Sequence, residues 1–167
     1  LMNNVLIYNT NSLTEKMISI QKGVSEDYWI VVRHVYDDNY LSFEVNSFGI
    51  NTNPVISTIS SSTFPILNQG PMAGWIATSP QNNAIIESNA MTNSYLYDFD
   101  NQTGVLTNQD TLIFYSTSNI AYGCAFSANG QIIYIGVGTY PSVRSIYQFD
   151  RSGGWGTVAA TLQINSL

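Results

Sequence analysis

The residues best suited to chemistry lie together around the single histidine of the chain. His34 ends the β-forming segment 28–34, and Asp37, Asp38 and Asn39 follow shortly after it. Imidazole and carboxylate groups can contact a polar ligand, and oxygens from several converging loops can bind a cation. One histidine excludes a metal motif built from two imidazoles within this sequence. Asp and Asn are also common turn residues, so we expect a structural or surface role for this stretch, with ligand contact as the alternative.

Tyrosine and tryptophan are abundant, and they supply a second group of candidate binding residues. The chain has 11 Tyr and 3 Trp, whereas only 10% of its residues are charged. Such a surface suits contacts with protein or sugar, because each ring adds a large contact area at little entropic cost. For aromatic residues at strand centres, packing between neighbouring sheets is the simpler interpretation. The candidate binding residues are therefore His34, Asp37, Asp38 and Tyr140.

The polar cluster at 98–101 could suggest a calcium site. Asp98, however, lies between Tyr97 and Phe99 on an expected strand, so its side chain should point away from those two rings. The segment 100–104, Asp-Asn-Gln-Thr-Gly, has the composition of a turn closed by a glycine at positive φ. We predict a turn and no metal site.

Common catalytic motifs do not occur in the sequence. It contains no Gly-X-Ser-X-Gly elbow, no Gly-rich phosphate loop and no Cys-X-X-Cys pair. The single cysteine, Cys124, lies in the apolar run YGCAF, where a small buried hydrophobe fits and no adjacent His or basic residue can activate the thiol. We predict no catalytic residue, no cofactor and a structural role for this thiol.

These residues must be positioned by β-strands, and the segment 74–115 shows the pattern most clearly. Four apolar stretches of strand length, GWIATS, AIIES, YLYDF and TLIFY, are separated by turns rich in Pro, Asn, Asp and Gly. A second copy occupies 122–164 in the same order. Ser79 matches Ser127 at a spacing of 48, and Phe99 matches Phe149 at a spacing of 50. These spacings are close to the ~40–50 residues of a propeller blade.

A more divergent third copy lies at 16–60, with strands KMISIQKG, DYWIVVRH, YLSFEVN and PVISTIS. A further apolar strand at 5–8 fits the outer strand of a preceding blade within 1–11. The sequence therefore predicts an all-β fold, a single β-propeller segment over 1–167. This arc has about three four-stranded antiparallel blades (16–60, 74–115 and 122–164) and one extra strand. Because a closed propeller has ~4–8 blades, we expect a longer polypeptide or further copies to complete the arc.

The alternation of residues along the strands also predicts which side chains are buried between sheets. Exposure of many of them would mean that the strand phase is wrong. The predicted core residues are Trp29, Val31, Trp75, Ile85, Phe99, Phe126, Ile133, Ile135 and Phe149.

The composition excludes several classes of partner. Hydrophobic residues make up 44% of the chain, and the net charge is −6 with only five basic residues. With so few basic residues, we expect no basic patch that could bind nucleic acid or an anionic membrane. No apolar run approaches the ~20 residues that span a bilayer, so membrane insertion is not expected. Asn, Ser and Thr outnumber the charged residues, as in an exported protein, and we expect an extracellular or cell-surface location.

The segment 15–34 resembles the start of a blade in large secreted surface proteins of Bacteroidetes-type bacteria. In that family, as in 15–34, a Glu-Lys-aliphatic stretch precedes a Trp-containing strand that ends in His. The turns 79–83 and 127–131 are similar to the family's Ser-Pro-Asp-Gly turns, and 97–106 resembles its Phe-Asp-X-X-Thr-Gly-X-Leu hairpin. The resemblance covers nearly the whole chain. It implies a WD-repeat-like or lactonase-like β-propeller in a context of type IX secretion and gliding motility.

The sequence predicts a non-enzymatic binding or scaffold module of an exported bacterial surface protein, which presents propeller loops to a protein or glycan partner in adhesion. An alternative is part of a lactonase-like or hydrolase propeller enzyme, with catalytic groups spread over the loops of several blades. A third is a structural subunit of a surface filament or assembly. Catalysis predicts that carboxylates and His34 converge, whereas a filament predicts contacts between copies through exposed blade edges.

Overall fold

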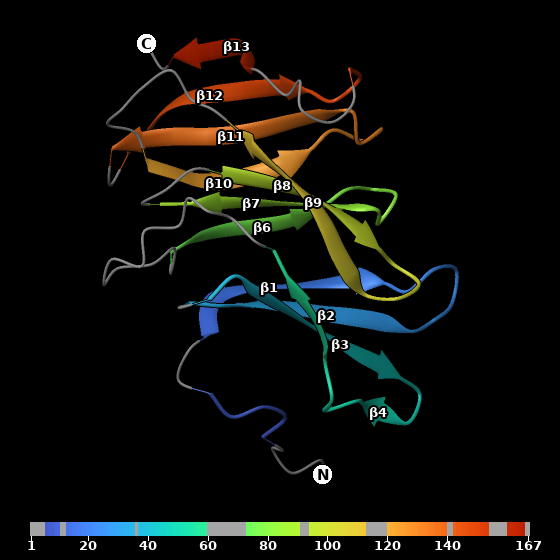
Figure 1. Ribbon diagram of the computed structural model, residues 1–167. Helices are drawn as coiled ribbons and strands as arrows, with labels where there is room; N and C mark the ends of the chain where they lie inside the picture. Colours follow the sequence, from blue (N-terminus) through green and yellow to red (C-terminus); the bar gives the residue numbers. More distant parts are fainter. Residues whose placement is uncertain are drawn as a thin grey trace.

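Three antiparallel β-sheets are stacked face to face in the order of the chain (Figure 1). The computed structural model describes residues 6–10, 13–35, 37–59, 73–90, 94–112, 120–139, 142–153 and 160–165. These residues contain strands and turns but no helix, so none of them forms a helix long and apolar enough to cross a bilayer.

The first sheet has a split outer edge. It contains β1 (Leu13–Gln21), β2 (Tyr28–His34), β3 (Asn39–Asn46), β4 (Gly49–Ile50) and β5 (Val55–Thr58). Both β4 and β5 pair with β3: β4 opposes Val45 and Asn46, and β5 opposes residues 39–42. The predicted single outer strand at 54–60 is therefore shorter, and a two-residue strand shares its edge of the sheet.

The second and third sheets each have four strands in sequence order. The second contains β6 (Gly74–Thr78), β7 (Ala84–Asn89), β8 (Ser94–Asp100) and β9 (Val105–Leu112). The third contains β10 (Ile120–Phe126), β11 (Ile132–Thr139), β12 (Ser142–Asp150) and β13 (Ala160–Asn165). Four-stranded meanders stacked in this way are propeller blades, and the predicted all-β propeller fold is confirmed.

The hairpin between β8 and β9 corrects the predicted position of the outer strand. Asp100 Oδ1 accepts a hydrogen bond from the Gln102 amide at 2.9 Å, and its Oδ2 accepts one from Thr103 Oγ1 at 2.7 Å. Gly104 closes the turn at φ +76°. The predicted aspartate turn is confirmed, and because it is so short β9 begins directly at Val105. The predicted strand TLIFY overlaps only the end of β9, and residues 113–115 lie outside the described part of the chain.

The N-terminal segment does not form the predicted strand over residues 6–8, and Val5 lies outside the described residues. Residues 6–10 have no regular secondary structure. The Tyr8 ring packs edge-on against Phe43, with ring centroids 5.5 Å apart. It lies on the outer face of the first sheet, beside the apolar cluster of Val32, Leu41 and Phe43. The segment therefore lies over a sheet face instead of extending a sheet edge.

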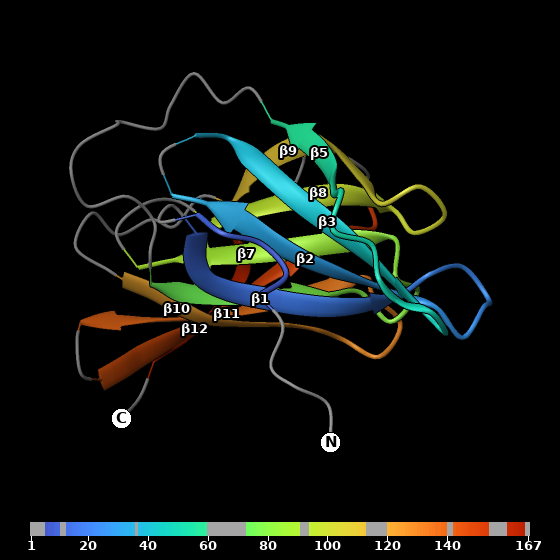
Figure 2. The ribbon, with the colours of Figure 1, turned by 90° about the horizontal axis from the view of Figure 1, so that it is seen from below.

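Both faces of the second sheet are buried, since successive residues of a strand point to opposite sides. One set, including Ile76, Ile85 and Phe99, packs against Trp29 and Val31 of the first sheet. The other set packs against the third sheet, and Figure 2 shows the same stacking from below. The second cluster consists of Ala84, Ile86, Leu96 and Leu112 with Ala121, Ile133, Ile135, Val137, Tyr147 and Phe149. Two apolar interfaces thus hold the three blades together.

Most of the predicted core residues are buried, and one prediction is wrong. Phe126 is half-buried, whereas Trp75 is 57% exposed. In β6 the neighbouring Ile76 is buried, so alternation turns Trp75 to the other side of the strand. The confirmed core residues are Trp29, Val31, Ile85, Phe99, Ile133, Ile135 and Phe149.

We expect Gly104→Ala to lower the free energy of unfolding by about 1–3 kcal/mol. A Cβ at this position would lie 2.9 Å from ring carbons of Trp29, and the backbone has a positive φ. Gly123→Ala is the matched control, because a Cβ there meets nothing within 4 Å. Urea denaturation of both variants measures the effect, and equal losses of stability would contradict this account of the turn.

Candidate functional site

The first strands of the three blades begin at one edge of the arc, on the left in Figure 1. Glu15 Oε1 of β1 accepts a hydrogen bond from the Gly74 amide at the start of β6, at 3.3 Å. Ser88, near the end of β7, donates to the Tyr122 carbonyl of β10. We call this the leading edge. The end of β2 lies beside the start of β1, where His34 pairs with Leu13, so this edge carries the candidate binding residues His34, Asp37 and Asp38.

The loop after β2 brings two of the predicted binding residues together. His34 Nδ1 lies 3.0 Å from Asp37 Oδ2, and Asp37 Oδ1 accepts a hydrogen bond from the Asn39 amide at 3.0 Å. Partial burial raises the pKa of Asp37, but these hydrogen bonds outweigh it and hold the pKa below its ordinary value. The Asp38 carbonyl accepts a backbone hydrogen bond from Ile59 at 2.9 Å. Tyr140 lies outside the described residues.

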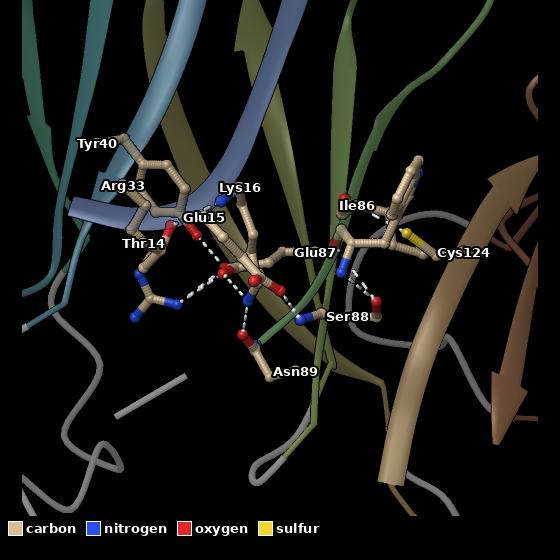
Figure 3. Close-up of polar contacts among 12 residues, drawn as sticks. Thr14, Glu15, Lys16, Arg33, Tyr40, Ile86, Glu87, Ser88, Asn89 and Cys124 are labelled. Atoms are coloured by element: carbon tan, nitrogen blue, oxygen red, sulfur yellow. Dashed lines mark hydrogen bonds and ion pairs between the residues drawn. The ribbon is translucent and has the colours of Figure 1, made fainter. Parts of the chain in front are cut away.

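A buried ionic cluster links the first two blades beside this loop (Figure 3). The Glu87 carboxylate of β7 is fully buried. Arg33 Nη1 of β2 donates to both of its oxygens at 2.9 Å, and Lys16 Nζ of β1 donates to Oε1 at 2.7 Å. The Tyr40 hydroxyl of β3 donates to Oε2, and Lys16 Nζ also donates to Asn89 Oδ1. Three strands of one blade thus converge on one carboxylate of the next.

Burial and charge act in opposite directions in this cluster. Burial raises the pKa of Glu87, but Arg33 and Lys16 lower it more, so the carboxyl stays ionised. For Lys16, burial is the larger effect and lowers its pKa although Glu87 raises it. Burial, reinforced by the adjacent Glu87 carboxylate, raises the pKa of Tyr40 well above its ordinary value, so this hydroxyl is a permanent donor.

Sequence reasoning did not find this cluster, although a signal exists. Arg33 lies in the apolar strand YWIVVRH and Glu87 in AIIES. A charge inside an apolar strand needs a partner, because burying it unpaired is costly. That rule could have marked both residues as members of a buried pair.

Exposed aromatic side chains occupy the inner strands at the leading edge. Trp75 of β6 is 57% exposed and Tyr122 of β10 is 48% exposed. Ser88 Oγ accepts a hydrogen bond from the Trp75 amide at 3.0 Å and donates to the Tyr122 carbonyl. One buried hydroxyl therefore fixes the backbones of both aromatic residues relative to each other.

The surroundings of Cys124 fit the structural role that the sequence predicts. This residue packs at the margin of the second apolar cluster, and burial raises its pKa to about 12. A protonated, half-buried thiol is a poor nucleophile. Within the described residues, no group of three or more His, Cys, Asp and Glu side chains is arranged to hold a metal ion.

Solved structures similar to this one are lactonase-like β-propellers. A protein from Lactobacillus plantarum shares 16% identity over 89% of this chain and 42% of that one, with a TM-score of 0.59. Two proteins provisionally described as 6-phosphogluconolactonases also match. The protein from Bacteroides fragilis shares 14% identity over 89% of this chain and 38% of its own, with a TM-score of 0.58. The protein from Bacteroides uniformis shares 12% identity over 92% of this chain and 41% of its own, with a TM-score of 0.60.

These comparisons establish the fold, and the identities are too low to carry an activity across. The chain spans less than half the length of each of these three structures. No protein-family model matches the sequence, and no curated protein matches it significantly.

We expect Glu87→Gln to destabilise the fold by about 3–5 kcal/mol, because it removes the buried carboxylate that Lys16 and Arg33 both contact. Glu44→Gln is the control. It removes a partly exposed ion pair with Lys22, whose side chains are each 26% exposed, and should cost less than about 1 kcal/mol. Urea denaturation at neutral pH compares the two variants. Similar losses would show that the buried cluster contributes no more than a surface pair.

The stability of the fold should also depend on pH through Glu87. Its pKa is lower in the folded state than the ordinary value of 4.5. Its contribution is therefore complete above the unfolded pKa and is lost as the pH falls through the folded pKa. We expect the unfolding free energy to fall less steeply between pH 7 and pH 3 for Glu87→Gln than for the parent chain. All other carboxylates are the same in the two chains, so the difference reports on Glu87 alone. Parallel curves would contradict this assignment.

Proposed function

We propose that the chain is a non-enzymatic binding or scaffold module that presents its leading edge to a protein or glycan partner. The observation that carries this proposal is the pair of exposed aromatic side chains, Trp75 and Tyr122, on adjacent inner strands. Large rigid rings give binding area at a small entropic cost, and they are enriched where proteins bind partners. Ser88 holds the two backbones in place, so the rings are presented by a rigid support.

The loop of His34, Asp37 and Asp38 adds polar groups to the same edge. An exposed carboxylate and a half-buried imidazole on the edge that also carries the aromatic rings suit a partner rich in hydroxyl or amide groups. Nearby, Glu87 is fully occupied by its own cations and by Tyr40. We therefore assign recognition to the exposed rings and the loop, and cohesion of the blades to the buried cluster.

An exported bacterial surface protein is the setting that we propose for this module. The supporting observation is the abundance of Asn, Ser and Thr relative to the 10% of charged residues. The resemblance of 15–34 to secreted blades supports the same setting, including type IX secretion.

Completion of the arc is part of this proposal. The outer face of the third sheet exposes Tyr134 and Ile146, which are 38% and 43% exposed. The equivalent faces between the three blades are buried. More of the same polypeptide, or a further copy of the chain, would cover this surface as one blade covers the next.

A lactonase-like enzyme is the second candidate. Two structural neighbours are provisionally described as 6-phosphogluconolactonases, and the His34 and Asp37 pair could move a proton. Hydrolysis of δ-lactones, including 6-phosphogluconolactone, tests it directly. A rate above the uncatalysed background that is lost in His34→Gln would replace the binding proposal with an enzymatic one.

Binding is tested with immobilised polysaccharides and surface proteins of chosen composition, followed by calorimetry on any positive pair. We expect Trp75→Ala and Tyr122→Ala each to weaken binding at least tenfold, as for exposed aromatic anchors. Tyr28→Ala is the control, since Tyr28 is a comparably exposed ring at the other end of the first blade. Equal losses in all three variants, or no binding in the panel, would contradict the proposal.

A further inference from the structure

An amine, a carboxamide and a carboxylate meet inside the cluster between the first two blades. Lys16 Nζ donates a hydrogen bond to Asn89 Oδ1 and lies 2.7 Å from Glu87 Oε1 (Figure 3). Glu87 and Asn89 are alternate residues of β7, so their side chains share one face of the strand. All three side chains are buried. This is the set of groups that acyl transfer from an amide to an amine requires: a nucleophile, an electrophile and a proton carrier.

We propose that Lys16 and Asn89 react within the folded chain to form a covalent amide cross-link, with Glu87 as the proton carrier. The free amine of Lys16 attacks Cγ of Asn89, and a bond forms between Nζ and Cγ. The bond between Cγ and Nδ2 of Asn89 breaks, and the nitrogen leaves as ammonia. Glu87 takes a proton from the lysine nitrogen and delivers one to the departing nitrogen, which restores its carboxylate. The reaction needs no oxidant, reductant or cofactor.

The geometry places the reacting atoms close together. Oδ1 is bonded to Cγ, so the hydrogen bond from Lys16 Nζ to Asn89 Oδ1 places the lysine nitrogen next to the carbon that it attacks. Arg33 and Tyr40 hold the Glu87 carboxylate from its other sides. Fixed groups of this kind convert a slow intermolecular reaction into a fast intramolecular one. Exclusion of water removes the competing hydrolysis.

The charges of the cluster favour the same reaction. Two cationic side chains, Lys16 and Arg33, contact one carboxylate. Burial lowers the pKa of Lys16, which raises the fraction of free amine. Conversion of Lys16 to an amide removes its charge, so Arg33 and Glu87 then form a balanced pair. The cross-link joins β1 of the first blade to β7 of the second, across a sequence separation of 73.

Mass spectrometry of the intact, folded chain tests the proposal. We expect the chain to be lighter than its sequence by one ammonia. Trypsin should fail to cleave after Lys16 and should release one branched product, in which residues 1–22 are joined to 34–144 through Lys16 and Asn89. A folded chain with the full sequence mass and normal cleavage after Lys16 would overturn the proposal.

Variants assign the roles of the three residues. Lys16→Arg and Asn89→Ala should abolish the branched product, whereas Lys22→Arg, which alters a lysine paired with Glu44 near the surface, should retain it. Glu87→Gln should abolish the product in chain that is folded by circular dichroism, and an unchanged yield would remove Glu87 from the reaction. If Glu87→Gln does not fold, the parent chain is made and purified in denaturant, so that it has never folded, and is then refolded. Product that appears only after refolding supports the proposal, and product that is already present in denaturant overturns it.

Discussion

The Glu87 carboxylate, buried between two sheets, is the constraint on which the first half of the molecule depends. A buried ion without partners would prevent the sheets from closing, because its desolvation costs several kcal/mol. Lys16, Arg33 and Tyr40 come from three different strands of the neighbouring blade and satisfy it together. The register of that blade is therefore tied to the position of a single side chain. A shift of β1, β2 or β3 by one residue would remove a donor from the cluster.

Apolar packing is the main contact between the second blade and the third, and Ser88 adds a hydrogen bond to the Tyr122 carbonyl. The cluster between them is made of aliphatic and aromatic side chains, with Ser88 and Cys124 at its margin. The two interfaces thus use different physical means: one combines apolar contact with a directional ionic cluster, and the other relies mainly on shape. The directional interface selects one relative position of its two sheets, whereas aliphatic packing tolerates small changes of side-chain volume.

The strands were predictable from sequence because their signals are local. Alternation and turn residues identified the blades, and the composition of 100–104 identified the hairpin turn that Asp100 and Gly104 form. The phase of β6 was predicted wrongly, because Trp75 and Ile76 are adjacent apolar residues and the pattern does not say which one faces the core. The N-terminal strand was predicted from apolarity alone, and Tyr8 satisfies that apolarity by packing on Phe43.

The ionic cluster could not be assembled from local patterns. Lys16, Arg33 and Tyr40 lie 71, 54 and 47 positions from Glu87, and they meet only when the sheets stack. The pairing of His34 with Asp37, three positions apart, is the kind of contact that a loop sequence does suggest. Among the polar groups of the candidate site, the sequence could therefore indicate the neighbours His34 and Asp37, but not the groups that meet only at the blade interface.

The first two blades are fastened at both ends of their shared interface. At the leading edge they are joined by the ionic cluster, and at the opposite edge Trp29 Nε1 donates to the Asn101 carbonyl at 2.9 Å beside Gly104. Two sheets fastened at one end can pivot, but two sheets fastened at both ends keep a constant splay angle. A force that pulls the two blades apart would act on the ion pairs and on the indole hydrogen bond at the same time. The two blades should therefore separate in one step, without first opening at one edge. The curvature of the arc at this point is therefore set by side chains at its two edges as well as by its core.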